Sequence, residues 1–274
     1  MSVATQIHPN DVARELIGRD YLSFSSLSLY RQCPLKFYFK YVEGLSEKTV
    51  SANLVFGGAI HAAAEFHFRN VMAGDASPDL DTLLHVYQDE WRQRASETVR
   101  FNKGQDADSL GRLAERMLRA FQASDIAQPD GRIIGIEEEL RGTLMDDVPD
   151  LLARIDLMTE ADDAVVVTDL KTSRGSWSGR QLEDAGEQLL LYHALASELI
   201  PDKPVQLQFA VLTKTKTPTM DVLPVDVTPH RLERTRQMVQ RIWRSIESRS
   251  FYPAPSPMNC PSCPFRDPCR AWSG

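Results

Sequence analysis

Two acidic side chains and a lysine stand in apolar surroundings in the second half of the chain. Asp156 lies in the run ARIDLM, and Asp169 lies in the run VVVTDLKT with Lys171 two residues further on. Because successive side chains of a strand alternate between its faces, Asp169 and Lys171 are expected on one face. A buried carboxylate or lysine is costly unless it is paired or binds a metal ion. The spacing therefore predicts a cation site lined by carboxylates, with a lysine beside it.

The turn that joins the two runs decides whether the carboxylates meet. If residue 160 pairs with residue 163, Asp156 faces position 167 and is diagonal to Asp169. Diagonal cross-strand neighbours have Cα atoms about 7–8 Å apart, so both carboxylates can reach one Mg²⁺ or Mn²⁺ ion. A lysine beside the ion can align or deprotonate a water and offset charge growing on a phosphate. The alternative is a solvated Asp-Lys pair at a strand end.

Two other segments offer further ligands. The run Glu137–Glu139 occupies the preceding expected strand, and Glu138 is the residue that we expect to face the side that Asp169 uses. The alternative is a charge run at a solvated edge. His61 lies in an expected helix with Glu65 one turn later on the same face, which makes His61 a candidate metal ligand. The alternative is a packed or surface histidine.

A polar pair follows the hairpin. Gln188 and Tyr192 lie four residues apart in the run QLLLY, within an expected helix. Residues at this spacing share a helix face, so both polar groups can reach into the same site. The alternative is that Tyr192 belongs to the core while Gln188 is exposed.

Four cysteines are unevenly distributed along the chain. Cys260, Cys263 and Cys269 lie in a proline-rich tail, and Cys33 lies near the other end. Four thiolates suit a zinc ion or an iron–sulfur cluster, and the spacing alone does not choose between them. The alternative is three unrelated thiols in a disordered tail. A metal centre would connect the tail to the N-terminal helical segment.

The composition excludes several classes of protein. Of the 274 residues, 42% are hydrophobic and 25% are charged, as in a globular protein. The 31 basic and 38 acidic residues give a net charge of −7, which excludes a uniformly basic coat but allows a local basic groove. No apolar run of about 18 residues and no secretory signal is visible. We therefore expect a cytoplasmic protein with reduced cysteines that does not bind membranes.

The expected helices and strands place these residues on a sheet and its neighbours. Helical periodicity predicts helices at 54–72, 80–100, 109–123, 179–199 and 228–249. An earlier helical segment is expected to begin with Ser25 or Ser26 as its N-cap and to break at Pro34. Short β-branched runs predict strands at 132–144, 150–160, 163–172, 205–213 and 219–225. The proline-rich tail is expected to contain no regular element.

These elements predict an α/β protein with a central mixed sheet flanked by helices. We expect a single domain over residues 1–274. Residues 1–20 are expected to form a loose arm and residues 21–130 a mostly helical part that holds Cys33. The α/β core is expected at 131–250, followed by the cysteine-rich tail at 251–274.

In their order along the chain, the motifs resemble the RecB-type PD-(D/E)XK nucleases that carry an iron–sulfur cluster. This family includes the AddB nuclease domain, the CRISPR adaptation nucleases and the exonuclease V group. The resemblance covers roughly residues 21–272 and rests on Gly57 with His61, Asp156, Asp169-Leu170-Lys171, Gln188 with Tyr192, and Cys33 with Cys260, Cys263 and Cys269. Ala153 stands near the Asp156 motif where relatives often have Gly, and Asp169 replaces the Glu of many relatives.

The resemblance implies a restriction-endonuclease-like core whose C-terminal tail closes a [4Fe-4S] site, with zinc as the alternative. It implies that His61, Asp156, Asp169 and the Leu170 carbonyl hold one or two Mg²⁺ or Mn²⁺ ions while Lys171 positions the attacking water. Gln188 and Tyr192 would orient the strand or the lysine. The implied reaction is hydrolysis of DNA, preferably single-stranded, to 5′-phosphate and 3′-hydroxyl ends during repair or recombination.

Basic residues outside the motifs are candidate contacts to nucleic acid. Arg234 and Arg241 lie seven apart on the exposed side of the expected helix at 228–249, and Lys214 and Lys216 follow the strand at 205–213. The alternative is an ordinary charged surface. A real basic groove should give binding that weakens steeply with salt.

Three other functions fit the same motifs. The protein could be a CRISPR spacer-processing nuclease, a non-catalytic DNA-binding iron–sulfur module of a helicase–nuclease complex, or a structural protein closed by zinc. The chain has no G-x-x-x-x-G-K-[ST] motif, so a helicase partner would be a separate chain. The candidate partners are therefore a helicase and a CRISPR adaptation integrase.

Overall fold

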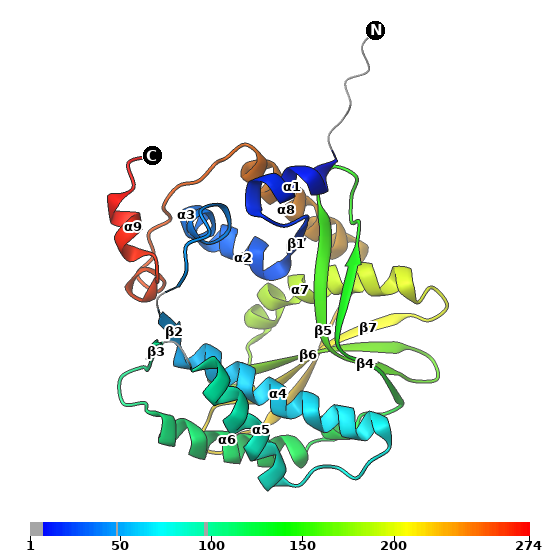
Figure 1. The fold of residues 1–274 in the computed structure, drawn as a ribbon. Helices are drawn as coiled ribbons and strands as arrows, with labels where there is room; N and C mark the ends of the chain where they lie inside the picture. Colours follow the sequence, from blue (N-terminus) through cyan, green and yellow to red (C-terminus); the bar gives the residue numbers. More distant parts are fainter. Residues whose placement is uncertain (1–7, 48, 96–97) are drawn as a thin grey trace. The chain divides into compact units, whose positions relative to one another are not determined.

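The computed structural model describes residues 8–47, 49–95 and 98–274, which form two compact units. The first unit combines the N-terminal part up to residue 48 with residues 140–153 and 228–274. The second unit combines residues 49–139 and 154–227. Figure 1 labels the helices and strands of both units. Our expectation of one domain with boundaries at 20, 130 and 250 stays a prediction.

A six-stranded mixed sheet has the order β1-β5-β6-β7-β8, and β4 also pairs with β5. Its strands are β1 (Tyr21–Ser23), β4 (Arg132–Gly142), β5 (Asp150–Glu160), β6 (Val165–Ser173), β7 (Val205–Thr213) and β8 (Met220–Val225). β5 is antiparallel to β6, and β7 is antiparallel to β8, whereas β6 and β7 are parallel. A separate parallel pair joins β2 (Thr49–Ser51) and β3 (Thr98–Arg100).

The hairpin of β5 and β6 has a different register from the one that we expected. Glu160 pairs with Val165 and not with residue 163. The cause is a four-residue turn, in which Ala161 N–H donates to the Ala164 carbonyl at 2.9 Å. The same register continued places Asp156 directly opposite Asp169, not diagonal to it. Because the shift is two residues, the two carboxylates still share a face.

Helices cover both faces of the sheet in the second unit. They are α4 (Ala52–Ala73), α5 (Leu80–Arg94), α6 (Ala107–Gln122), the 3₁₀ turn η2 (Asp125–Ala127) and α7 (Gly179–Leu199). Leu170, Ala210 and Leu212 of the sheet pack into one apolar cluster with α4, α5 and α6. Since strand side chains alternate, Asp169 points to the other face, where Gln188 of α7 contacts it. The predicted α/β fold with a central mixed sheet flanked by helices is confirmed.

The first unit consists mainly of short helices. They are α1 (Pro9–Ile17), α2 (Phe24–Gln32), α3 (Pro34–Phe37), the π-helical turn η1 (Tyr38–Val42), α8 (Pro229–Glu247), the 3₁₀ turn η3 (Cys260–Ser262) and α9 (Arg266–Ala271). The expected N-cap at Ser25 or Ser26 is wrong, because Ser23 caps α2 through a reciprocal pair of hydrogen bonds with Ser26.

Two segments expected to be irregular contain helices. In the predicted loose arm, residues 1–7 lie outside the described residues, but residues 9–17 form α1. The His8 ring caps its first turn, and Gly18 at φ 66 ends it. The proline-rich tail contains α9, a single short helix around Cys269.

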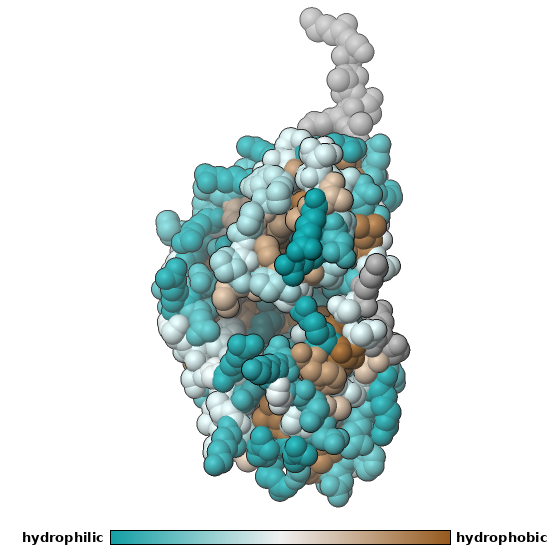
Figure 2. Space-filling model, turned by 90° about the vertical axis from the view of Figure 1, so that its left-hand side faces the viewer, coloured by the Kyte–Doolittle hydropathy of each residue, from teal (hydrophilic) through white to brown (hydrophobic). Residues whose placement is uncertain are grey.

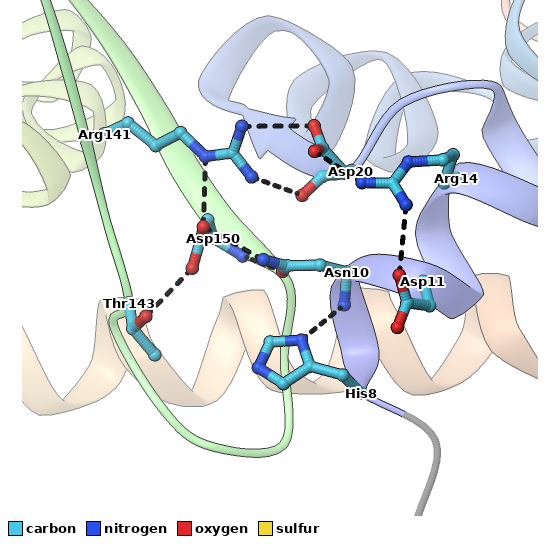
Figure 3. A network of polar contacts seen from close by, with 8 residues as sticks. All are labelled: His8, Asn10, Asp11, Arg14, Asp20, Arg141, Thr143 and Asp150. Atoms are coloured by element: carbon cyan, nitrogen blue, oxygen red, sulfur yellow. Dashed lines mark hydrogen bonds and ion pairs between the residues drawn. The ribbon is translucent and has the colours of Figure 1, made fainter.

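A network of charged residues ties the first unit together around the start of β5 (Figure 3). Asp150 Oδ2 accepts hydrogen bonds from Asn10 Nδ2 and from Arg141 Nε, both at 3.0 Å. Its Oδ1 accepts from the Thr143 hydroxyl at 2.8 Å. Arg141 Nη1 also lies 3.1 Å from Asp20 Oδ1. The carboxylate of Asp150 therefore joins α1, β4 and β5.

The face drawn in Figure 2 is mostly hydrophilic, with small areas of hydrophobic residues between charged ones. Among the described residues, the large apolar side chains that remain exposed include Leu54, Met72, Leu199 and Met258. None of the described helices combines the length and the apolar character that crossing a membrane requires.

Candidate active site

Three potential metal ligands converge in the second unit from three different elements. His61 of α4, Glu137 of β4 and Asp156 of β5 each offer a ligand atom, and these atoms all lie within 4.8 Å of one another. His61 Nδ1 lies 3.8 Å from Asp156 Oδ2. An imidazole nitrogen with two carboxylates is a donor set that suits a divalent cation.

β4 brings Glu137, and not the expected Glu138, to this group. Gly135 and Ile136 are consecutive buried residues, so the alternation of β4 is interrupted just before the glutamates. Glu137 itself has φ 51, a left-handed conformation that is uncommon outside glycine. Glu138 is exposed. No sequence signal reveals this interruption, because three consecutive glutamates do not show which of them faces the site.

Glu137 is partly shielded from water and surrounded by both signs of charge. Its carboxylate forms an ion pair with Arg154 Nε at 3.2 Å. Burial raises the pKa of Glu137, the Glu65 carboxylate raises it further, and Arg154 opposes the rise. A carboxyl whose negative charge is costly in the absence of a cation is suited to bind one.

Asp156 lies just beyond the last described pair of β5 and β6 and still contacts the β6 backbone. The described pairing of the two strands extends as far as Leu157 and Thr168. Beyond it, Asp156 Oδ2 accepts a hydrogen bond from the backbone N–H of Leu170 at 2.6 Å. Burial and the neighbouring Asp169 charge raise the pKa of Asp156 well above its ordinary value. The side chain of Asp156 therefore bonds to β6 where backbone pairing is not described, and its carboxylate lies among the potential metal ligands.

Asp169 and Lys171 form an ion pair at the C-terminal half of β6. Lys171 Nζ lies 2.5 Å from Asp169 Oδ2, and Asp169 is only 2% exposed. Gln188 Nε2 donates to Asp169 Oδ1 at 2.9 Å and to the Tyr192 hydroxyl oxygen at 2.7 Å. Burial raises the pKa of Asp169, and Lys171 opposes this. These contacts bring together four residues that the sequence analysis selected.

His61 is held in its neutral form. Burial lowers its pKa to about 4, and the charge of Lys171 acts in the same direction. A hydrogen bond to the Leu170 backbone opposes the shift, so the Leu170 carbonyl faces the His61 ring. The charges of Arg94 and Lys214 lower the pKa further. A neutral imidazole is the form that binds metal ions.

The four cysteines gather in the first unit and form no disulfide. Cys33 lies between α2 and α3, Cys260 begins η3, and Cys269 lies in α9. Cys33, Cys263 and Cys269 pack against an apolar cluster formed by Leu35, Phe39 and Phe265. Burial raises the pKa of Cys269, and the charges of the other three thiols raise it further, so all three lie near Cys269.

The thiols of the described residues do not form a group as tight as a tetrahedral zinc site. Zn–S bonds of about 2.3 Å in a tetrahedron place the sulfur atoms about 3.8 Å apart. Among the described residues, no three thiols have sulfur atoms that all lie within 4.8 Å of one another. In addition, the Ser256 backbone N–H donates to Cys260 Sγ at 3.2 Å. Such N–H contacts to sulfur are among the features that tune iron–sulfur clusters.

The four basic candidates fall in different units. Arg234 and Arg241 are exposed on α8 of the first unit. Lys214 and Lys216 follow β7 in the second unit, where Lys216 is exposed and Lys214 is half-buried. Lys214 Nζ lies 5.0 Å from the ring centroid of Phe56 in α4. Of the four, Lys214 is the residue whose charge acts on His61.

Comparison with known proteins identifies the family. The sequence profile described as the PD-(D/E)XK nuclease superfamily matches residues 21–270. A solved structure from Eubacterium rectale, named "Putative exonuclease", is 14% identical with a TM-score of 0.54, covering 99% of this chain and 93% of its own. A second solved structure, named SSO0001, is 16% identical with a TM-score of 0.38, covering 89% of this chain and 95% of its own. No curated protein matches the sequence. Since the profile match spans nearly the whole sequence, the chain belongs to the PD-(D/E)XK nuclease superfamily.

Proposed function

We propose that the protein is a metal-dependent deoxyribonuclease, a single-strand-preferring exonuclease that acts in DNA repair or recombination. The observation that carries this proposal is the buried Asp169–Lys171 ion pair in the same unit as the ligand group of His61, Glu137 and Asp156. Burying these charges together is costly for a protein that only needs a stable core. A catalytic role supplies the reason for keeping them.

The residues present fit a divalent cation. His61, Glu137 and Asp156 would hold Mg²⁺ or Mn²⁺ through one nitrogen and several oxygen atoms, and Asp169 and the Leu170 carbonyl are proposed as further ligands. When bound, such an ion lowers the pKa of a water molecule and polarises a phosphate. The raised pKa values of Asp156 and Asp169 mean that their charged forms lack sufficient positive neighbours without the ion.

The side chains around this group have different roles in the proposed reaction. Lys171 Nζ, beside Asp169, offers a positive charge to the phosphate oxygens and to the attacking water. Gln188 fixes the Asp169 carboxylate through its hydrogen bond to Oδ1. In the reaction, a water oxygen forms a bond to phosphorus and the bond to the 3′ oxygen breaks. The leaving oxygen takes up a proton, which gives a 5′-phosphate and a 3′-hydroxyl.

We propose a [4Fe-4S] cluster as the group that the four cysteines bind. In such a cluster each thiolate binds its own iron atom, so the sulfur atoms stand farther apart than on one ion. The N–H donated by Ser256 to Cys260 Sγ and the apolar cluster beside Cys33, Cys263 and Cys269 support this assignment. The aromatic rings packed around Cys33 and Cys269 would shield the cluster from water. Its role would be to fasten the C-terminal tail to α2 and α3.

DNA is the proposed substrate, with a helicase or a CRISPR adaptation integrase as candidate partners. The name of the Eubacterium rectale structure supports an exonuclease by analogy. Spacer processing for CRISPR adaptation and a non-catalytic DNA-binding role are the competing functions. The DNA cleavage assay described next tests the non-catalytic role.

The test uses anaerobically purified protein, Mn²⁺ and single-stranded DNA labelled at either the 5′ or the 3′ end. Wild-type protein should degrade the DNA, Lys171→Ala should not, and the label that is released first gives the polarity. Lys203→Ala is the matched control, because Lys203 also forms an ion pair, with Glu160, but precedes β7, whereas Lys171 pairs with Val211 near the other end of that strand. Inactivity of wild type and Lys171→Ala alike, with DNA still bound, would reject the nuclease and favour the binding module.

A further inference from the structure

Two glycines of α4 let neighbouring side chains approach the helix beside His61. Gly58 precedes His61 by three residues, so both lie on one side of α4. A Cβ atom at Gly58 would lie 2.8 Å from Arg94 Cζ, which means that the guanidinium group lies against this backbone. A Cβ atom at Gly57 would lie 3.4 Å from Thr172 Oγ1. The absence of side chains here therefore makes room for Arg94 of α5 and for the end of β6.

Lys214 reaches the same end of α4 from the residue after β7. Its Nζ lies 5.0 Å from the Phe56 ring, which gives the ammonium an aromatic neighbour. Lys214 is half-buried, and no carboxylate of the described residues forms an ion pair with it. Burial lowers its pKa, and the Arg174 charge lowers it further. A shielded cation without a carboxylate is unfavourable unless an anionic ligand completes the site.

Three cations from three elements act together on His61. Lys171 of β6, Arg94 of α5 and Lys214 all lie near enough to this imidazole for their charges to reach it. Arg94 is held by an ion pair with Glu90, one turn earlier in α5. The carboxylates of Glu137 and Asp156 lie with His61 as the other half of the arrangement. The unit therefore has acidic groups suited to a metal ion and, next to them, three basic side chains, of which Lys171 and Arg94 have a carboxylate partner and Lys214 has none among the described residues.

We propose that Lys214 and Arg94 bind the phosphate group next to the one that is hydrolysed. The ligand is a phosphodiester chain with at least two consecutive phosphates, of which one lies at the metal ligands and Lys171 and the next lies between Lys214 and Arg94. This inference rests on the proposed nuclease function and deepens it, because it names the residues that bind the phosphate next to the scissile one. Arg94 was not among the residues selected from the sequence.

The experiment measures binding of a fluorescent single-stranded DNA to the full chain at several salt concentrations. All proteins carry Lys171→Ala to prevent cleavage. For single strands, each phosphate contact contributes about −0.7 to the slope of log K against log salt. Lys214→Ala and Arg94→Ala should each make the slope about 0.7 less steep and weaken binding about tenfold. Lys214→Gln replaces Lys214→Ala if the latter unfolds, as circular dichroism would reveal.

One matched control lies just before β7 and the other lies on α5. Lys203→Ala removes a lysine just before β7 that pairs with Glu160, and Arg92→Ala removes an α5 arginine that pairs with Asp89. Neither should change the slope. A further probe is a series of oligonucleotides that each carry one neutral methylphosphonate linkage at a different position. At one position the modified DNA should bind the Lys171→Ala parent protein less well than unmodified DNA does. Adding Lys214→Ala should abolish that difference.

The possible results separate the two proposals. Parent protein that binds DNA, with unchanged slopes in both Lys214→Ala and Arg94→Ala, would overturn the second phosphate site and leave the nuclease function intact. Parent protein that binds no DNA would overturn both. Slopes that change as much in the Lys203→Ala and Arg92→Ala controls would also overturn the site, because the effect would then be one of net charge.

Discussion

Gln188 Nε2 donates a hydrogen bond to Asp169 Oδ1 at 2.9 Å, which links α7 to the carboxylate that pairs with Lys171. Asp169 is 2% exposed, so this amide takes the place of solvent at that oxygen. The same nitrogen donates to the Tyr192 hydroxyl oxygen at 2.7 Å. Gln188 of α7 therefore fixes the orientation of the Asp169 carboxylate of β6.

Replacing Gln188 should impair cleavage more than replacing Tyr192. Gln188→Leu leaves a buried carboxylate oxygen without its donor, which costs about 1–3 kcal/mol. We expect the single-turnover cleavage rate to fall about 10-fold to 100-fold. Tyr192→Phe keeps the Gln188–Asp169 hydrogen bond and should cost less. Equal rates for Gln188→Leu and wild type, with equal melting temperatures, would show that the contact is dispensable.

Glu137 and Glu138 provide a matched pair for metal binding. Glu137 lies with His61 and Asp156, whereas Glu138 is exposed. Glu137→Gln should raise the dissociation constant of Mn²⁺ at least about tenfold, a loss of about 1.4 kcal/mol, as measured by calorimetric titration. Glu138→Gln should bind Mn²⁺ as wild type does. A weaker Mn²⁺ affinity in Glu138→Gln than in Glu137→Gln would show that Glu138, and not Glu137, binds the ion.

The hairpin illustrates what a sequence pattern determines and what it does not. Alternation of side chains along one strand predicted that Asp169 and Lys171 share a face, and Asp156 joins them because the register differs from the expected one by an even number of residues. The pairing of Glu160 with Val165 depends on the length of the turn, which four polar or small residues did not reveal. Glu138 was selected over Glu137 because the pattern carries no sign of the interruption at Gly135 and Ile136.

Most of the longer helices were predictable to within a few residues because their periodic apolar positions extend over several turns. Residues 179–199 are an example, since α7 spans the same range. The helix expected at 80–100 is the exception, since α5 ends at Arg94 and residues 98–100 form β3. Arg94 could not be found in this way. Its position against Gly58 arises from the packing of α5 on α4, and nothing in the neighbouring sequence marks it. Side chains that meet only through tertiary packing lie beyond the reach of local patterns.

The cysteine group should bind iron. Anaerobically purified wild type is expected to contain about four iron atoms per chain and to absorb visible light broadly. Cys263→Ser should lose most of the iron and lower the melting temperature, because the C-terminal tail then loses its attachment. Met258→Ala changes a residue that is 84% exposed in the same tail and should retain the iron. A colourless protein with one zinc per chain would reject the cluster.

Acid should weaken the first unit through Asp150. Burial raises the pKa of Asp150, but hydrogen bonds from Thr143, Arg141 and Asn10 outweigh it, so the pKa lies below its ordinary value of 3.8. The ionised carboxylate therefore stabilises the fold above about pH 3.8, and this contribution is lost as the pH falls through the lower pKa of the folded state.

Asp150→Asn is the variant that tests this dependence. At pH 6 its free energy of unfolding should be lower than that of wild type by about 1–2 kcal/mol. The difference should shrink as the pH falls below about 3.8, where the carboxylate of the unfolded chain becomes protonated, and should be lost below the lower pKa of the folded state. Urea unfolding at several pH values measures it. A difference that stays constant between pH 6 and pH 3 would contradict the ionic role of Asp150.

The most direct test of the nuclease site is the single-turnover cleavage rate of single-stranded DNA by Lys171→Ala at saturating Mn²⁺. Lys171 contributes charge to the phosphate and the water but is not a metal ligand, so the variant should still bind Mn²⁺ and DNA. Its rate should be at least about a thousandfold below that of wild type, a loss of about 4 kcal/mol of transition-state stabilisation. A rate within tenfold of wild type would contradict the assignment of the Asp169–Lys171 pair as the centre of the chemistry.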